Sequence, residues 1–332
     1  MTIVIVILLL ACIVSFTLAA FIRRMAIRLR LMNESNARSL HSGSVPIGGG
    51  LAIIAVWYIG TAVFFWLGLM DKSLFYALLC GLVLAGVSLL DDIIQVKPII
   101  RLIVHFSVAI ASLYLLGGLR KPVTPGIDIL SIPAVINPLA VVGMVWFINL
   151  YNFMDGADGF ASVEAISIAL VLFAFTGSME LLLLVSAVLG FLYWNWPKAK
   201  IFMGDVGSTQ LGFILVVLGI NYHNTLDFSI FNWLMISSPF WFDATLTLFR
   251  RWRNKEKLSE AHRKHTYQRF IQAGYSHKEL DLALIFFNGT IFLMILVYRE
   301  FEIMKIPITL FTLGILYYFT RRVDRLFPFA KD

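Results

Sequence analysis

The 332-residue sequence predicts an all-α integral membrane protein with about eleven transmembrane helices. Hydrophobic residues make up 59% of the chain and charged residues only 14%, against about a quarter in soluble domains. The mean hydropathy is +0.84, and apolar stretches recur along the whole chain. We therefore expect a single polytopic membrane domain over residues 1–332.

The predicted helices follow from the rule that a spanning helix needs roughly 20 mainly apolar residues. Two segments, 137–151 and 208–222, are short, so we expect them to be incomplete or tilted. The first segment lacks the preceding basic residues of a signal peptide and is expected to stay as a helix. The predicted segments are 2–22, 47–68, 73–90, 99–117, 137–151, 160–177, 180–196, 208–222, 229–249, 282–299 and 303–320.

Charge asymmetry between alternate loops predicts the orientation. When the loop 23–46 is placed in the cytoplasm, 22 of the 27 Lys and Arg residues fall on that side. This favours an N-terminus outside and a C-terminus in the cytoplasm. Topology therefore explains the net charge of +7 better than nucleic-acid binding does. The expected cytoplasmic loops are 23–46, 91–98, 152–159, 197–207 and 250–281.

The segment 149–160 is the most polar part of an otherwise apolar region. Asn149, Asn152, Asp155 and Asp158 recur at every third position, which would place them along one stripe of a helix. Carboxylates at the end of a membrane helix are costly unless a cation or a ligand neutralises them. A polar helix end with glycine caps is the simpler alternative, but the pattern favours a functional site.

Four polar motifs fall on the predicted cytoplasmic face, and together they contain five acids. Clustered carboxylates raise one another's pKa, and a hard divalent cation such as Mg²⁺ would relieve this. Because Mg²⁺ usually takes one or two protein carboxylates, we expect one or two of these acids to bind it directly. The motifs are Asp91-Asp92, the 149–158 stripe, Gly204-Asp205-Val206-Gly207-Ser208 and His262-Arg263-Lys264-His265.

Two of these motifs have the character of phosphate-binding segments. Gly204–Ser208 is expected to open a helix, where free N–H groups and the helix dipole favour an anion. His262–His265 would add cationic donors for a pyrophosphate, with both histidines on one helix face. An ordinary N-cap and ordinary positive-inside charge are the alternatives. Asp243, inside the ninth predicted span, would either pair with an arginine or line a substrate groove.

In order and spacing, these motifs resemble those of the polyprenyl-phosphate N-acetylhexosamine-1-phosphate transferases. The resemblance is closest to the members that initiate bacterial O-antigen or related surface glycans. It is weaker to the MurNAc-pentapeptide transferase, whose basic loop carries adjacent histidines. The matching segments are Asp91-Asp92, Asn149-x-x-Asn152-x-x-Asp155-Gly-x-Asp158-Gly, Phe202-Met-Gly-Asp205-Val-Gly-Ser208, His262-Arg-Lys-His265-x-Tyr-Gln268 and Arg38-Ser-Leu-His41 through Gly49.

The resemblance implies a phosphoglycosyl transferase of the bacterial cytoplasmic membrane, dependent on Mg²⁺ or on Mn²⁺ in its place. A UDP-N-acetylhexosamine would donate its sugar 1-phosphate to undecaprenyl phosphate on the cytoplasmic side and release UMP, beginning O-antigen and hence lipopolysaccharide synthesis. The expected partners are these two substrates and the lipid bilayer, not nucleic acid. The sugar (GlcNAc, GalNAc, QuiNAc or FucNAc) and the existence of a homodimer are left open.

The resemblance also implies roles for individual residues. Asp205 would be the main metal ligand, joined by Asp92, and one of Asp91 and Asp92 would deprotonate or orient the lipid phosphate. Because the second pKa of a phosphate is near 6, orientation is expected to matter more than proton abstraction. The expected catalytic residues are Asp91, Asp92, Asp155 and Asp158, and the expected substrate-binding residues are Asn149, Asn152, Gly204, Ser208, His262, Arg263 and His265.

The main alternative is an ion-coupled membrane transporter with an acidic cytoplasmic site, because intramembrane acids often mark ion paths. That function predicts acids near the bilayer midplane and an internal repeat. The main acids instead lie at the inner boundary, with only Asp243 and Glu164 deeper, and we find no repeat. A purely structural role would leave the one-sided cluster of acids unexplained.

Overall fold

The computed structural model describes residues 2–33, 43–94, 96–120, 132–225, 228–258, 260 and 262–329. Within these residues the chain is almost entirely helical. The exception is one short antiparallel ladder, in which β1 (Met32–Asn33) pairs with β2 (Val45–Pro46). The predicted all-α membrane fold is confirmed, and the chain is a multi-pass membrane protein.

Over the described ranges, seven helical stretches are long and apolar enough to cross a membrane, and α2, α7 and α8 are shorter apolar helices. A 3-10 turn, Glu302–Met304, joins the last two helices. The helices are α1 (Thr2–Leu29), α2 (Gly50–Trp66), α3 (Lys72–Leu79), α4 (Gly81–Ile94), α5 (Pro98–Leu115), α6 (Pro133–Met154), α7 (Phe160–Thr176), α8 (Met179–Asn195), α9 (Asp205–Thr225), α10 (Ile230–Ile236), α11 (Ser238–Arg253), α12 (Thr266–Gln272), α13 (His277–Glu300) and α14 (Lys305–Leu326).

The two segments predicted to be short are full-length helices. The helix α6 has 22 residues and α9 has 21, which is enough to cross a bilayer. Hydropathy underestimated the lengths of both helices, because their polar ends, Asn152 in α6 and Asp205 in α9, are also helical. The polar motifs therefore extend these two helices.

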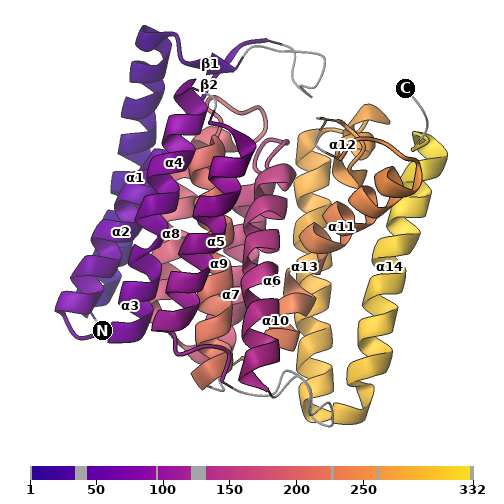
Figure 1. Ribbon diagram of the computed structural model, residues 1–332. Coiled ribbons are helices and arrows are strands. Elements are labelled where there is room, and N and C mark those ends of the chain that lie inside the picture. Colours follow the sequence, from indigo (N-terminus) through magenta and orange to yellow (C-terminus); the bar gives the residue numbers. More distant parts are fainter. Residues whose placement is uncertain are drawn as a thin grey trace.

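The ninth predicted span, 229–249, is wrong as a continuous helix. Ser237 ends α10 and begins α11, and Pro239 occupies the first turn of α11. Proline is tolerated there because the first N–H groups of a helix need no partner inside it. The helix α11 consequently leans away from α10 and runs across towards α14 (Figure 1).

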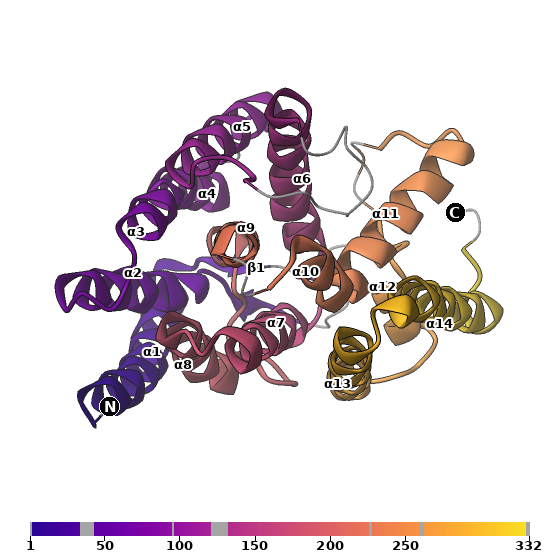
Figure 2. The ribbon, with the colours of Figure 1, turned by 90° about the horizontal axis from the view of Figure 1, so that it is seen from below.

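The helix α9 is the centre of the bundle. Viewed along the helices, α1 to α8 and α10 are arranged around it, while α13 and α14 stand to one side (Figure 2). Its most apolar 18-residue window is 94% buried, far more than that of any other candidate span. The surrounding helices therefore fix the positions of the residues at the ends of α9.

Backbone contacts fix the first residue of α9 against the start of α2. The N–H groups of Gly49 and Gly50 donate to the carbonyls of Phe202 and Met203, both at 2.9 Å. A Cβ on Gly50 would lie 2.8 Å from the nitrogen of Gly207, so only glycine permits this approach. The segment that precedes α2 thus holds the beginning of α9 in place.

Replacement of Gly190 in α8 with alanine is expected to destabilise the bundle. The added methyl group would clash with the Cys12 carbonyl and lie 2.7 Å from the Phe16 nitrogen, both in α1. Overpacking of this kind typically costs about 1–3 kcal/mol. The melting temperature in detergent should therefore fall. In the control, Gly289→Ala, the added methyl group meets nothing within 4 Å, and equal melting temperatures would contradict this packing.

Candidate active site

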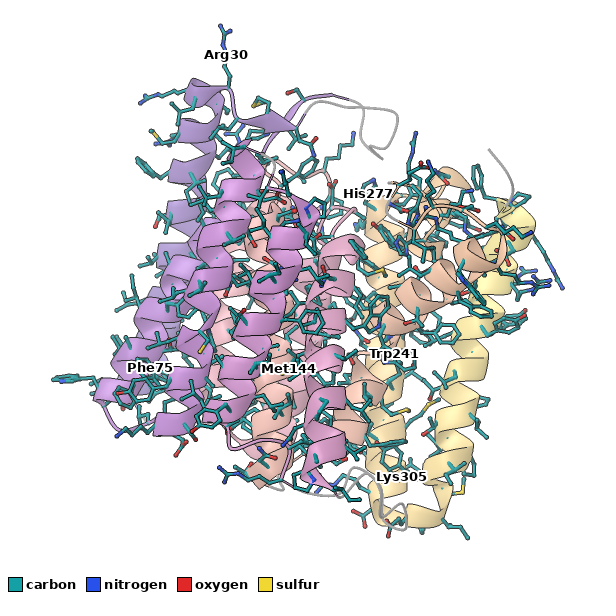
Figure 3. The ribbon with its side chains drawn as sticks, in the orientation of Figure 1. Arg30, Phe75, Met144, Trp241, His277 and Lys305 are labelled. Atoms are coloured by element: carbon teal, nitrogen blue, oxygen red, sulfur yellow. The ribbon has the colours of Figure 1, made fainter. Side chains whose placement is uncertain are left out.

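Four of the five predicted acids come together where α4, α5, α6 and α9 meet. Asp91 and Asp92 lie in the last turns of α4, Asp205 is the first residue of α9, and Asp155 directly follows α6. This is the end of the bundle at which α1 finishes beside Arg30, opposite Lys305 (Figure 3). The convergence expected from the loops is therefore present for these four residues.

Asp92 fixes the start of α9. Its Oδ1 accepts the N–H of Asp205 at 3.1 Å, and its Oδ2 accepts the N–H of Val206 at 3.3 Å. The next two N–H groups both donate to the carbonyl of Gly204. The expectation that this helix start offers free N–H groups to a phosphate is therefore wrong in this structure. The helix dipole favours an anion here, and Asp92 supplies it.

Arg101 of α5 is a site residue that the sequence analysis counted only as a topology signal. Its guanidinium pairs with Asp91 and lies 3.4 Å from Oδ2 of Asp205. The other oxygen of Asp91 accepts the N–H of Val96 at 2.7 Å. The sequence did contain a signal for it. Arg101 and His105 are four residues apart, so they share one face of the helix that follows Asp91-Asp92.

The predicted asparagines are both hydrogen-bonded inside the protein. Asn149 donates to the Val145 carbonyl at 2.7 Å and to Nδ1 of His105 at 3.1 Å. Asn152 donates to Oγ of Ser208 at 2.9 Å, and it also hydrogen-bonds the carboxyl group of Asp205. The two amides thus connect α6 to the helices that carry the acids.

Asp155 occupies the C-cap of α6, and its N–H donates to the Asn152 carbonyl at 3.2 Å. Burial raises the pKa of its carboxyl group well above the usual range, and the nearby carboxylates of Asp205, Asp92 and Asp158 raise it further. Asp155 therefore lies close enough to Asp205 and Asp92 on one side, and to Asp158 on the other, for their charges to affect it.

Asp158 lies near Asp155 but is held by other elements, and the prediction of one helical stripe fails for it. The helix α6 ends at Met154, so the chain has left the helix before residue 158. Oδ2 of Asp158 accepts the N–H of Ala199 at 3.0 Å, and its own N–H donates to Nδ1 of His277 at 2.9 Å. Asp158 thus connects the turn before α7 to the α8–α9 loop and to α13.

The segment from His262 to His265 is not helical, contrary to prediction. Residues 262–264 are irregular, and His265 is the N-cap of α12. The two rings still meet, with centroids 4.9 Å apart. Burial lowers the pKa of His262 to about 3, helped by His265 and Arg251, and burial also lowers the pKa of His265. The expected cationic histidines are therefore neutral, because desolvation disfavours their charged forms.

Tyr267 joins this basic loop to the acids. Its hydroxyl group donates to the Phe153 carbonyl at 3.1 Å, and its ring stacks on Phe160. A Cβ at Gly156, in the turn between α6 and α7, would clash with the Tyr267 hydroxyl oxygen, so this turn needs glycine at that position. The basic loop is thereby held next to Asp155.

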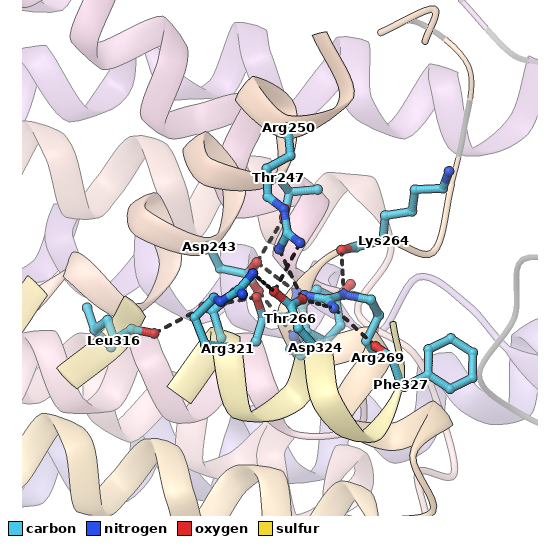
Figure 4. Close-up of polar contacts among 12 residues, drawn as sticks. Asp243, Thr247, Arg250, Lys264, Thr266, Arg269, Leu316, Arg321, Asp324 and Phe327 are labelled. Carbon is cyan, nitrogen blue, oxygen red and sulfur yellow. Dashed lines mark hydrogen bonds and ion pairs between the residues drawn. The ribbon is translucent and has the colours of Figure 1, made fainter. Parts of the chain in front are cut away.

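Asp243 has a capping role that neither of its two predicted alternatives included, although it also lines a small cavity beside Tyr267 and Phe160. Its carboxylate accepts the N–H groups of Thr266 at 2.8 Å and Tyr267 at 3.1 Å, and the hydroxyl group of Thr247 at 3.1 Å (Figure 4). It therefore caps the start of α12 from within α11. The predicted segment Arg38–His41 lies outside the described residues.

The acids at the start of α9 fit a hard divalent cation. Among the residues that the structure describes, no three His, Cys, Asp or Glu side chains are grouped closely enough to hold a metal alone. Mg²⁺ needs fewer, since it usually takes one or two carboxylates and shares its remaining positions with water and phosphates. Asp92 and Asp205 adjoin at this point, and an ionised carboxylate has about four lone-pair sites.

An apolar cavity of about 440 Å³ lies between α6, α9, α10 and α11. Met144 of α6 and Trp241 of α11, both labelled in Figure 3, are among its lining residues. Gly143 and Leu150 also line it, and Leu150 is two residues before Asn152. The cavity therefore extends along α6 as far as Leu150, about one turn before the helix ends at Met154.

Comparison with known proteins gives consistent matches. The family model described as glycosyl transferase family 4 matches residues 74–223, which include Asp91 and Asp92 of α4, Asp155 after α6 and Asp205 of α9. A probable undecaprenyl-phosphate N-acetylglucosaminyl 1-phosphate transferase of Bacillus subtilis is 31% identical over 292 residues, covering 82% of this chain and 78% of the relative.

Two further relatives are more distant. The undecaprenyl-phosphate alpha-N-acetylglucosaminyl 1-phosphate transferase of Salmonella typhi is 27% identical over 282 residues, 77% of this chain and 73% of the relative. The decaprenyl-phosphate N-acetylglucosaminephosphotransferase of Mycobacterium leprae is 27% identical over 330 residues, 85% of this chain and 80% of the relative. The chain therefore belongs to the polyprenyl-phosphate N-acetylhexosamine-1-phosphate transferases of glycosyl transferase family 4.

Proposed function

We propose that the protein transfers an N-acetylhexosamine 1-phosphate from a UDP-sugar to undecaprenyl phosphate and releases UMP. The observation that carries the proposal is the pair Asp92 and Asp205 at the start of α9, beside an apolar cavity. A charged site and an apolar cavity suit a reaction between a polar donor and a lipid acceptor. The names of the relatives make UDP-N-acetylglucosamine the first donor to test.

Asp205 and Asp92 would hold Mg²⁺ or Mn²⁺, which offsets the charge of a reacting pyrophosphate when bound. Asp92 is held in position by the first N–H groups of α9, so its carboxylate is fixed before any substrate arrives. Arg101, between Asp91 and Asp205, offers N–H donors to a phosphate at the same point. Asp91 and Asp92 would orient the lipid phosphate, which is already largely ionised at pH 7.

The donor would lie between the acids and the basic loop. Asp155 and Asp158 would be on its nucleotide side, and Arg263 would contact its phosphates. His262 would contribute a neutral imidazole there, which can still donate one hydrogen bond. The position of Tyr267, which joins the loop to the turn at Gly156, supports this arrangement.

The apolar cavity between α6 and α11 would take the polyprenyl chain. Its aromatic and aliphatic lining offers no charge, which suits an isoprenoid chain, and Leu150 brings it to the level of Asn152. On the charge asymmetry of the loops, the acid end faces the cytoplasm. The reaction would then begin O-antigen synthesis on the cytoplasmic side.

The transporter alternative is not supported. The relatives are transferases by name, and the deeper acids have structural partners. Asp243 caps α12, and Glu164 accepts the amide of Asn288 at 2.6 Å.

The reaction class is tested by incubating purified protein with undecaprenyl phosphate, Mg²⁺ and a panel of UDP-N-acetyl sugars. We expect UMP release that requires the lipid and stops with EDTA. The donor that gives UMP also identifies the sugar. Release of no UMP from any donor by folded protein, or release unaffected by EDTA, would contradict the proposed substrates or the proposed metal.

Asp205→Asn should lower turnover by about 100-fold or more, because a charged group at the reacting phosphates is lost. The variant should keep its melting temperature in detergent. The matched control is Asp71→Asn, since Asp71 caps α3 away from the acid site and asparagine is an equally good N-cap. Normal turnover by Asp205→Asn would remove this residue from the metal site.

Gly143→Phe should raise the KM for undecaprenyl phosphate and leave the KM for the UDP-sugar unchanged. Gly143 lines the cavity, and a Cβ there meets nothing within 4 Å, so a ring can enter the space without disturbing the backbone. Gly314→Phe, at an equally open helical glycine of α14, is the control. Equal lipid KM values for the two variants would place the polyprenyl chain elsewhere.

A further inference from the structure

A buried network of charges joins the C-terminal helix to the basic loop (Figure 4). Asp324, near the end of α14, accepts hydrogen bonds from both Nη atoms of Arg250, at 3.1 and 3.0 Å. The same carboxylate pairs with Arg269 and lies 3.3 Å from Nη1 of Arg321. One carboxylate therefore meets three guanidinium groups from α11, α12 and α14.

Arg269 carries the network into the loop. Its side chain is almost fully buried, and its Nε donates to the carbonyl of Lys264 at 3.1 Å. Its Nη1 also donates to the Phe327 carbonyl at 3.2 Å. A buried guanidinium is costly without a carboxylate partner, so Asp324 is needed to keep Arg269 in this position.

The loop is held from the opposite side by α11. Asp243 receives the N–H groups of Thr266 and Tyr267, directly after the last residue of the basic loop. Asp243 and Arg269 therefore fix the backbone on both sides of His265. Neither of these contacts uses the side chain of His262 or Arg263.

Arg251, next to Arg250 on α11, holds the earlier part of the loop. It is also buried, and it donates to the carbonyls of Lys257 at 2.6 Å and Glu260 at 3.1 Å. Its Nε pairs with Glu256, which in turn pairs with Lys264 at 3.2 Å. Internal charge pairs thus organise the described part of the connection between α11 and α12.

We propose that Asp324 is a positioning residue for the nucleotide-sugar donor. By neutralising Arg250 and Arg269, it holds the segment His262–His265 in the conformation that meets the donor's phosphates, without contacting the donor itself. The inference rests on the proposed function, in which this segment binds the donor. It assigns a catalytic consequence to a residue on the last helix, outside the matched family region of 74–223.

The test compares Asp324→Asn with the unchanged protein in the full chain. We expect the KM for the UDP-sugar to rise about tenfold, because a loop released from the charge network must be ordered again when the donor binds. The KM for undecaprenyl phosphate should change less than twofold. Hydrogen exchange of the amides of residues 262–268 should become faster. A merely structural role would lower the active fraction and leave both KM values unchanged.

Two further variants sharpen the test. Arg321→Ala is the matched control, because Arg321 meets the same carboxylate from α14 but its side chain is 58% exposed. It should leave both KM values unchanged. Arg250→Gln removes a half-buried partner and should reproduce the donor effect, which keeps the proposal testable if Asp324→Asn does not fold.

The outcomes separate this inference from the proposed function. If the unchanged protein releases UMP but the donor KM and loop exchange of Asp324→Asn and Arg250→Gln are unaltered, the positioning role is overturned. If donor and lipid KM values rise equally, the network supports the fold in general and the inference also fails. An unchanged protein that releases no UMP contradicts the proposed function instead.

Discussion

The contact between the carboxylate of Asp92 and the first N–H groups of α9 is the interaction on which the site depends. The first N–H groups of a helix have no partner inside it, so those at the start of α9 need a partner elsewhere in the protein. Asp92 provides that partner, which ties the end of α4 to the end of α9. Arg101 and Asn152 then complete the arrangement from α5 and α6.

A second helix start in the site is also capped by an acid from another helix. Asp243 caps α12 from within α11, as Asp92 caps α9 from within α4. The sequence indicated a ligand or ion-path role for both acids, and in the structure both accept backbone N–H groups. An acid held in this way has a fixed orientation, and acids of this kind give a rigid site.

Hydropathy predicted nearly every helix, because lipid-facing surface must be apolar whatever the helices contact inside. Loop charge also predicted that the acids at the ends of α4, α6 and α9 share one end of the bundle. The missing information concerns contacts between distant segments: nothing local to Asp92 shows that it caps α9, and the charge of Arg101 was already explained by topology. Asp158 and the histidines were misplaced because a spacing of three residues identifies a helix face only while the helix continues.

The break at Ser237 turns α11 away from α10, and the cavity beside α6 reaches the outer surface there, since Leu139 and Leu234 both line it and are exposed. On the proposed function, the lipid would enter sideways and would never leave the bilayer, while the nucleotide would never leave the water. Only the reacting phosphates would have to meet at the boundary. The effective concentration of the acceptor is then its number of molecules per area of membrane. Adding other lipids to the membrane would lower this surface density and slow the reaction, whereas diluting the solution would not.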